Sequence, residues 1–318
     1  MKTKQFVMML TLSMMSANAM AGEPLKSGVS LADMNTSVKA GDDFYEYACG
    51  GWMKANPLPP AFSRYGSFDR LAEDNNKRIN GILNELGNNT YPQGTIEQKL
   101  SDFYKLAMDS VRREKDGVQP VMPLIKKLEA AKTIKQLFEV QLEMAKFGDS
   151  EFYNAGMGAD EKNAKQNILN VRQGGLILGQ KDYYLEDDEA TTKIREAYKK
   201  HIVRMFQLFG FSKGVATKKM QNIFRLELAL AKVSKSRTEL RDPQANYNKM
   251  TLQEFNSKYP YLKLEQVMNA QGLRSQYLQE LVVGQPTFMA GANSILAKIK
   301  PAEYRDYMEW GVIVNAAN

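Results

Sequence analysis

Apolar residues recur every three to four positions through most of this chain, which is the spacing of one face of an α-helix. The clearest predicted helix begins near Ser67, a good N-cap residue, and ends at Gly87. Other helices are predicted at residues 44–49 (stopped by Gly50-Gly51), 95–113, 120–131, 133–147, 190–209 and 215–235, and shorter ones from residue 251 onward. Capping boxes are predicted at Thr133–Gln136 and Thr251–Glu254. The sequence therefore predicts a mainly α, multi-helical protein.

Residues 151–178 depart from this helical spacing. Phe152, Asn154 and Gly156 alternate, and a looser alternation follows the polar residues 160–165. This pattern is typical of two short strands joined by a turn. We predict one small β-hairpin in an otherwise helical protein.

The first residues have the order of a secretory signal peptide. Lys2 and Lys4 precede an apolar run that is far shorter than the ~20 residues of a membrane-spanning helix, and small residues end at Ala21. We predict a signal peptide over residues 1–21, with a buried N-terminal helix as the alternative. Residues 22–40 carry no apolar period and are predicted to form a mobile leader. The protein is expected to be exported, periplasmic or extracellular, without a membrane anchor.

The cysteine content and the charge bear on two further questions: whether disulfides stabilise the fold, and whether the protein binds nucleic acid. Cys49 is the only cysteine, so the chain cannot form an internal disulfide and must rely on core packing. The net charge is +7 at pH 7, but the basic residues are interspersed with acidic ones along the predicted helices. No block of lysine and arginine with interleaved aromatic residues occurs, so no nucleic-acid partner is expected.

Groups for hydrolytic chemistry are scarce. The chain has a single histidine, His201, whereas a catalytic zinc needs about three protein ligands, usually with histidines among them. Serine–histidine or cysteine–histidine catalysis would need the same residue. Paired acids at 42–43 and 187–188 suit helix N-termini, although two carboxylates could also serve a glycosidase. We predict no catalytic residues and no metal site, and hence no cofactor, in this chain.

Several segments form a specific set when they are taken together. They are DDFYEYACGGW (42–52), SRYGSFD (63–69), GGLIL (174–178), KDYYL (181–185), LELALA (226–231), RDP (241–243) and YNKMT (247–251). In this order and spacing they resemble the N-terminal region of the neprilysin and endothelin-converting-enzyme family of zinc metallopeptidases, which includes bacterial endopeptidase O. The resemblance extends from about residue 38 to the end.

The resemblance implies a fold of two mainly helical lobes around a large cavity. Residues 41–240 would be the N-terminal part of the first, peptidase lobe, and residues 245–318 the start of the second, capping lobe. Family members are roughly twice this length, and their C-terminal half carries H-E-x-x-H, a further glutamate ligand and a substrate-binding Asn-Ala motif. The resemblance therefore implies a truncated chain, with zinc bound only in the full-length protein.

Two residues of the SRYGSFD segment are implied to bind substrate. In the family, its Arg and Asp form a pocket beyond the scissile bond, which corresponds here to Arg64 and Asp69, and Phe68 would line the same wall. A guanidinium binds a carboxylate through two parallel hydrogen bonds. Without the resemblance, Asp69 would be assigned as a first-turn acid at the helix dipole and Arg64 as its ion-pair partner.

Three hypotheses follow. The first is the N-terminal half of a secreted neprilysin-like zinc metalloendopeptidase that acts on peptides and is inactive alone. The second is a complete, non-catalytic exported module that binds peptides. In the third, a separate polypeptide supplies the catalytic half, and the lone chain exposes apolar surface that seeks this complement.

Overall fold

The structure, a computed structural model, describes residues 28–60, 62, 64–146 and 152–316. Contacts divide the chain into two compact units, residues 1–109 and 110–318. The predicted signal peptide and the start of the predicted leader lie outside the described residues. Among the residues that are described, none of the helices has the length and apolarity needed to cross a bilayer.

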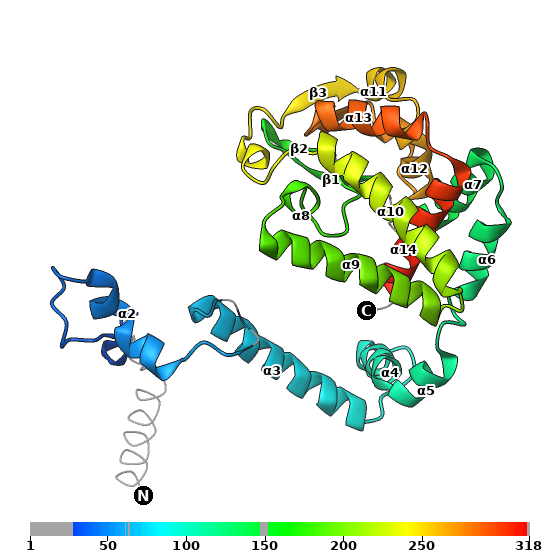
Figure 1. Cartoon of the computed structure of the whole chain (residues 1–318). Helices are drawn as coiled ribbons and strands as arrows, with labels where there is room; N and C mark the ends of the chain where they lie inside the picture. The colour runs from blue at the N-terminus through cyan, green and yellow to red at the C-terminus, as the bar shows by residue number, and fades with distance from the viewer. Residues whose placement is uncertain (1–27, 61, 63, 147–151, 317–318) are drawn as a thin grey trace, which may run out of the picture. The chain divides into compact units, whose positions relative to one another are not determined.

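In the described residues, the first unit has four helical segments (Figure 1). They are the 3₁₀ helix η2 (Leu31–Asp33) and the α-helices α2 (Phe44–Ala55), α3 (Ser67–Asn88) and α4 (Ile96–Met108). Asp43 caps α2, because its Oδ1 accepts a hydrogen bond from the Glu46 amide at 2.9 Å. The N-cap of α3 is Gly66, so Ser67 is the first helical residue and not the predicted cap.

The prediction that Gly50 and Gly51 end a helix at residue 49 was wrong, because α2 continues to Ala55. A Cβ atom on Gly51 would lie 2.4 Å from the carbonyl oxygen of Ala32, and one on Gly50 would lie 2.8 Å from Cβ of Asn35. The two glycines therefore allow the preceding segment to approach the helix closely. Their role is packing and not helix termination.

Residues 28–40 belong to the segment that was predicted as a mobile leader. They contain η2, and Asn35 is bonded to α2: its amide donates to the carbonyl of Tyr47 at 2.8 Å, and its Nδ2 donates to Glu46 Oε1 at 2.8 Å. Polar side chains and backbone groups make this contact, so no apolar period in the sequence predicted it.

The second unit contains most of the predicted helices, within a few residues of their expected ends. Its helices are α5 (Ser110–Asp116), α6 (Met122–Ala130), α7 (Ile134–Ala145), α8 (Asp182–Leu185), α9 (Glu189–Leu208), α10 (Lys213–Val233), η3 (Glu239–Arg241), α11 (Leu252–Lys258), α12 (Leu264–Ala270), η4 (Ser275–Tyr277), α13 (Pro286–Leu296) and α14 (Pro301–Ala316). The capping boxes predicted at Thr133 and Thr251 are present. The helix predicted at 95–113 is divided into α4 and α5.

The predicted β-hairpin is part of a larger sheet. Strands β1 (Tyr153–Asp160) and β2 (Asn163–Gln173) pair antiparallel, as expected. The sheet continues with β4 (Glu280–Val283), parallel to β2, and then β3 (Asn248–Thr251), in the order β1-β2-β4-β3. The predicted hairpin is confirmed. The rest of the sheet was not predicted, because β3 and β4 have four residues each and are too short to show an alternation of their own.

One hydrophobic core serves the whole second unit. Helix α10 packs against α9, α13 and α14 (Figure 1). Strand β4 brings residues from the C-terminal part of the chain into the sheet. Residues 245–318 thus share a core with residues 110–240. The assignment of either stretch to a lobe of a longer protein stays a prediction.

The crossing of α13 over α10 depends on Gly291, and the first prediction concerns this glycine. A Cβ atom there would lie 2.6 Å from Cγ1 of Val233, so Gly291→Ala should overpack the crossing and lower the free energy of unfolding by about 1–3 kcal/mol. Gly214→Ala in α10 is the control, because nothing lies within 4 Å of its added Cβ and alanine favours helix. Urea unfolding followed by circular dichroism measures the free energy of unfolding of both variants. Equal values for Gly291→Ala and Gly214→Ala would contradict the packing argument.

Candidate functional site

The three predicted substrate-binding residues lie at the start of α3. Arg64 belongs to the extended segment before the helix, and Phe68 and Asp69 belong to its first turn. Asp69 Oδ2 accepts a hydrogen bond from the amide of Gly66 at 2.8 Å, which fixes the beginning of the helix. Phe68 is 85% exposed and Arg64 is also exposed.

The ion pair predicted between Arg64 and Asp69 is not among those formed in the described part of the chain. Asp69 instead satisfies a backbone amide, which confirms its interpretation as a first-turn acid. The guanidinium of Arg64 stays at the surface, where its donors can reach a carboxylate from outside. The structure thus places the three residues close together in the chain at the start of α3, without an ion pair between Arg64 and Asp69.

An aromatic cluster holds the segment that carries Arg64. The Tyr65 ring stacks on Trp52 of α2, with 6.0 Å between centroids, and meets the edge of Phe62 at 5.4 Å. The Tyr65 hydroxyl donates to Glu73 Oε2 at 2.7 Å, and this bond raises the pKa of Tyr65 above its usual value. These contacts tie the segment to both α2 and α3.

A cavity of about 650 Å³ lies beside this segment, among η2, α2 and the start of α3. Aromatic and methionine side chains make up seven of its 15 lining residues, and Cys49, a half-buried free thiol, also faces it. Tyr65, Gly66 and Ser67 form one of its edges. Arg64 and Phe68 come directly before and after these edge residues in the chain. The cavity is an apolar recess next to the surface cation Arg64. Such a site suits a ligand with an apolar body and a negatively charged end.

Two of the family-like motifs meet in the second unit around a buried carboxylate. Glu227 of α10 is fully buried, and it accepts hydrogen bonds from the hydroxyls of Tyr184 (3.2 Å) and Tyr198 (2.8 Å). The indole of Trp310 donates to the Tyr198 oxygen at 2.8 Å. This network links α8, α9, α10 and α14, so Tyr184 and Tyr198 contribute to the packing of the second unit.

Burial raises the pKa of Glu227, and a second prediction follows from this shift. Desolvation raises the pKa of Glu227 from 4.5 to about 8, although the two tyrosine hydrogen bonds act to lower it. Because the folded pKa lies above the unfolded one, this group stabilises the fold most below pH 4.5, and its contribution is lost as the pH rises to about 8. Relative to wild type, Glu227→Gln should therefore gain roughly 2 kcal/mol or more between about pH 5 and pH 8.5.

Urea titrations at several pH values measure that difference in the free energy of unfolding. The exposed Glu139→Gln on α7 is the matched control and should show no such gain. A constant difference between Glu227→Gln and wild type across this range would show that Glu227 does not titrate as proposed.

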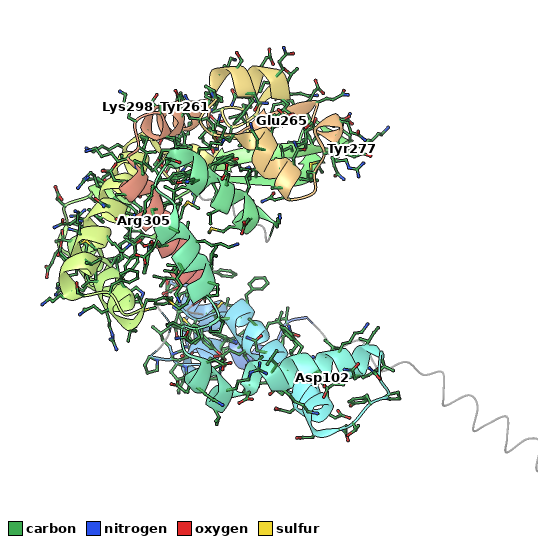
Figure 2. All side chains as sticks on the ribbon, turned by 90° about the vertical axis from the view of Figure 1, so that its right-hand side faces the viewer. Asp102, Tyr261, Glu265, Tyr277, Lys298 and Arg305 are labelled. Carbon is green, nitrogen blue, oxygen red and sulfur yellow. The ribbon has the colours of Figure 1, made fainter. Side chains whose placement is uncertain are left out.

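A second buried polar cluster joins α10 to α14. The ammonium group of Lys219 lies 3.1 Å from Asp306 Oδ1 and 2.5 Å from Glu309 Oε2, and Asn222 Nδ2 donates to Asp306 Oδ2 at 2.7 Å. Burial raises the pKa of Glu309 to about 7, while Lys219 acts to lower it. Arg305, labelled in Figure 2, lies on α14, and its Nη2 is 3.4 Å from Asp306 Oδ1. The two acids, three residues apart among Tyr307, Met308 and Trp310, are the signal in the sequence for this cluster.

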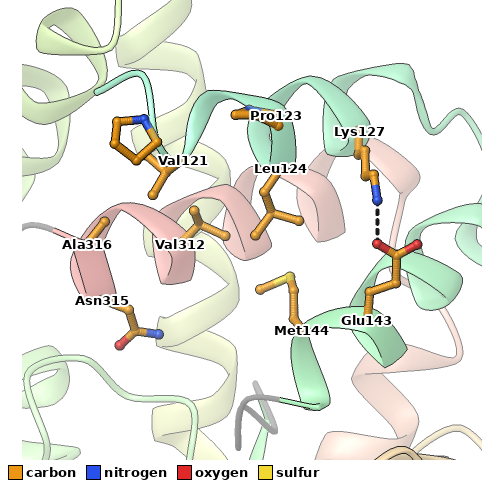
Figure 3. Close-up of a pocket in the computed structure, with 10 residues that line it drawn as sticks. Val121, Pro123, Leu124, Lys127, Glu143, Met144, Val312, Asn315 and Ala316 are labelled. Carbon is orange, nitrogen blue, oxygen red and sulfur yellow. Dashed lines mark hydrogen bonds and ion pairs between the residues drawn. The ribbon is translucent and has the colours of Figure 1, made fainter. Parts of the chain in front are cut away.

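Another cavity, of about 760 Å³, lies among α6, α7 and α14 (Figure 3). Val121, Leu124, Met144 and Val312 give it an apolar lining. Lys127 and Glu143, both about half exposed, also line it and form an ion pair at 2.5 Å. Because this pair is solvated and no buried acid–base pair lines the cavity, its residues suggest packing and not catalysis.

The described residues contain no group of three or more histidine, cysteine, aspartate or glutamate side chains placed to hold a metal ion. His201 lies on α9 and is exposed, and its ring meets that of Trp310 edge-on at 5.8 Å between centroids. This ring contact belongs to the packing of α9 against α14.

Comparisons with known proteins agree with this geometry. A family model described as peptidase family M13 matches residues 40–318. Endothelin-converting enzyme 1 of Cavia porcellus is 30% identical over 292 residues, covering 89% of this chain and 38% of that protein. Neprilysin of Mus musculus is 26% identical, covering 92% and 42%. The inhibitor-bound crystal structure of Mycobacterium tuberculosis zinc metalloprotease ZMP1 matches with a TM-score of 0.80 at 22% identity, covering 91% and 44%.

The helical fold and the family match define a metallopeptidase relative: the chain belongs to peptidase family M13. More particularly, it corresponds to the N-terminal region of the neprilysin-like members of this zinc-dependent family. The chain spans about two fifths of the length of the curated relatives that it matches.

Proposed function

We propose that this chain is the N-terminal half of a secreted, neprilysin-like zinc metalloendopeptidase that acts on peptides, and that it is inactive alone. The observation that carries the proposal is the family match over residues 40–318 in a sequence with one histidine. Because catalytic zinc usually takes histidines among its about three protein ligands, the ligand set would come from polypeptide outside this sequence. Residues 1–21 would be removed during export.

Within that peptidase, the start of α3 would contribute a wall of the peptide-binding site. The exposed guanidinium of Arg64 would bind a substrate carboxylate, and the exposed ring of Phe68 would contact an apolar side chain. Asp69 would act indirectly, because its carboxylate fixes the first turn of the helix through Gly66. This assignment rests on the resemblance of the SRYGSFD segment together with the exposure of these side chains.

Metal analysis and a peptide-cleavage assay of the purified chain test whether zinc binding and catalysis need polypeptide outside this sequence. We expect no stoichiometric zinc and no chelator-sensitive cleavage. We also expect the gene downstream of codon 318, or an adjacent gene, to encode H-E-x-x-H. Stoichiometric zinc with cleavage by the lone chain would overturn the proposal.

A complete peptide-binding module is the second candidate, and the cavity beside Tyr65 favours it. Calorimetry with short peptides that bear a free C-terminal carboxylate tests the binding wall. Binding by the lone chain, weakened about ten-fold by Arg64→Ala, would support a wall that binds without the catalytic half. Arg78→Ala, an exposed change on the same helix, is the control and should have no effect. The module hypothesis would be rejected if the chain bound no peptide, or if Arg64→Ala bound peptide with the same affinity as wild type.

A further inference from the structure

A third cavity, of about 380 Å³, lies within the second unit, and all of its lining residues belong to this unit. They come from α7, α12, α13 and α14, from Phe152, from Ile299, and from the loop that joins α11 to α12. Small-molecule sites in proteins have volumes of roughly 300–1,000 Å³. This cavity therefore has the size of a site for a small ligand.

The walls of this cavity are mostly apolar. Aliphatic and aromatic side chains make up eight of its 12 lining residues. Phe152 and Leu262 are buried, and Phe138 and Ile299 are half-buried. Because the transfer of apolar surface out of water is favourable, these walls fit a ligand with an apolar body.

Gln141 of α7 brings a polar group into this lining, although its side chain is only 4% exposed. Its Oε1 accepts a hydrogen bond from the hydroxyl of Tyr304, whereas its Nε2 donates none within the described part of the chain. A buried donor without an acceptor costs free energy. An acceptor oxygen on a ligand in the cavity would therefore be stabilised by Gln141.

The charged residues of the lining are two lysines, Lys135 of α7 and Lys263 of the loop before α12. Neither forms an ion pair with another described residue, and the described lining contains no acidic side chain. Two cations beside an apolar space create a positive potential in it. Hydrogen bonds from an ammonium group to a carboxylate are stronger than neutral ones. The charge of this cavity therefore favours an anion.

The backbone of Lys263 is in the left-handed region, with φ 54° and ψ 30°. Glycine or asparagine adopts this region at a lower cost than lysine. The adjoining residues hold the backbone in place: the amide of Tyr261, labelled in Figure 2, donates to Asn293 Oδ1 at 2.8 Å, and the carbonyl of Leu262 accepts from the Tyr153 hydroxyl at 3.2 Å. Strained residues that are held in this way cluster at ligand-binding sites. The strain thus indicates a use for the Lys263 side chain.

We propose that this cavity binds a small organic anion with an apolar body and one carboxylate, which is either a free carboxylic acid or the C-terminal residue of a peptide. The body packs against the aromatic walls, and the ammonium groups of Lys135 and Lys263 bind the carboxylate. The Nε2 of Gln141 donates to one of the carboxylate oxygens. This site is separate from the wall that carries Arg64, and it does not depend on the proposed peptidase function.

Calorimetry of the full chain with 4-phenylbutyrate tests the site. We expect one-to-one binding, and a dissociation constant that is about ten-fold higher or more for the uncharged 4-phenylbutyramide. Lys135→Gln/Lys263→Asn should weaken binding of the acid by a similar factor. Asparagine adopts the left-handed region more readily than lysine, so this variant should unfold at no lower urea concentration than wild type. Lys126→Gln/Lys258→Gln is the matched control, because it removes two exposed lysines outside the lining and should bind like wild type.

The peptide glycyl-glycyl-phenylalanine distinguishes the two sources of the carboxylate. Tighter binding of this peptide than of 4-phenylbutyrate would support a peptide C-terminus as the ligand, and the reverse would support a free acid. The site would be overturned by no saturable binding of either compound up to about 10 mM, by equal binding of the acid and its amide, or by equal affinities of the two lysine double variants. It would also be overturned if Arg64→Ala abolished binding, since the ligand would then lie beside Tyr65. The comparison of acid with amide uses the unchanged chain, so it decides the question even if a variant is unstable.

Discussion

Lys219→Met is expected to lower the free energy of unfolding of the second unit by about 3–5 kcal/mol near pH 7.5. The Lys219 side chain is 5% exposed, and it stands between Asp306 and Glu309, whose side chains are 3% and 0% exposed. Its removal would leave two buried carboxylates with only Arg305, a partly exposed cation, nearby. The cost should be smaller near pH 5, because burial already raises the pKa of Glu309 to about 7 and protonation would relieve the buried charge.

Tryptophan fluorescence can follow this unfolding separately from that of the first unit. The chain has two tryptophans, Trp52 and Trp310, so Trp52→Phe leaves a probe in the second unit only. In that background, Lys218→Met is the matched control: it is exposed on the same helix and should change stability by less than about 0.5 kcal/mol. A loss for Lys219→Met no larger than that of the control would show that the buried cluster contributes nothing.

Trp310→Ala should destabilise the second unit by a similar amount, about 3–5 kcal/mol. The indole is 1% exposed and packs among Tyr198, His201 and Phe206, with ring centroids 5.8–6.1 Å away. Truncation leaves a cavity and also removes the donor to the Tyr198 hydroxyl, which in turn bonds Glu227. Circular dichroism in urea measures the effect, since the fluorescent probe is lost.

Trp310→Phe separates the two contributions. It keeps most of the ring volume but removes the indole N–H, so it should cost only the unsatisfied hydrogen bond and part of the packing, about 1–3 kcal/mol. If Trp310→Phe were as unstable as Trp310→Ala, the hydrogen-bond network and not the filled volume would hold α14 in place.

Helix positions could be predicted from the sequence because their signals are local. Capping boxes at Thr133 and Thr251 and the 3.6-residue period set the beginnings of α7 and α11 to within a residue. The SRYGSFD segment likewise placed Arg64, Phe68 and Asp69 at the start of α3, although their role in binding stays a prediction. The partner of Asp69 could not be predicted, since Gly66 competes for it through a backbone amide.

The sequence alone determined the class of fold and the scarcity of metal-binding imidazoles, because periodicity and residue type are properties of the chain itself. Only the tertiary structure decided which segments share a sheet, why Gly50 and Gly51 lie inside a helix, and that Glu227 meets Tyr184 and Tyr198. Those features depend on contacts between residues far apart in the chain. Four-residue strands and buried carboxylates are stabilised by such contacts and leave no periodic pattern in the sequence.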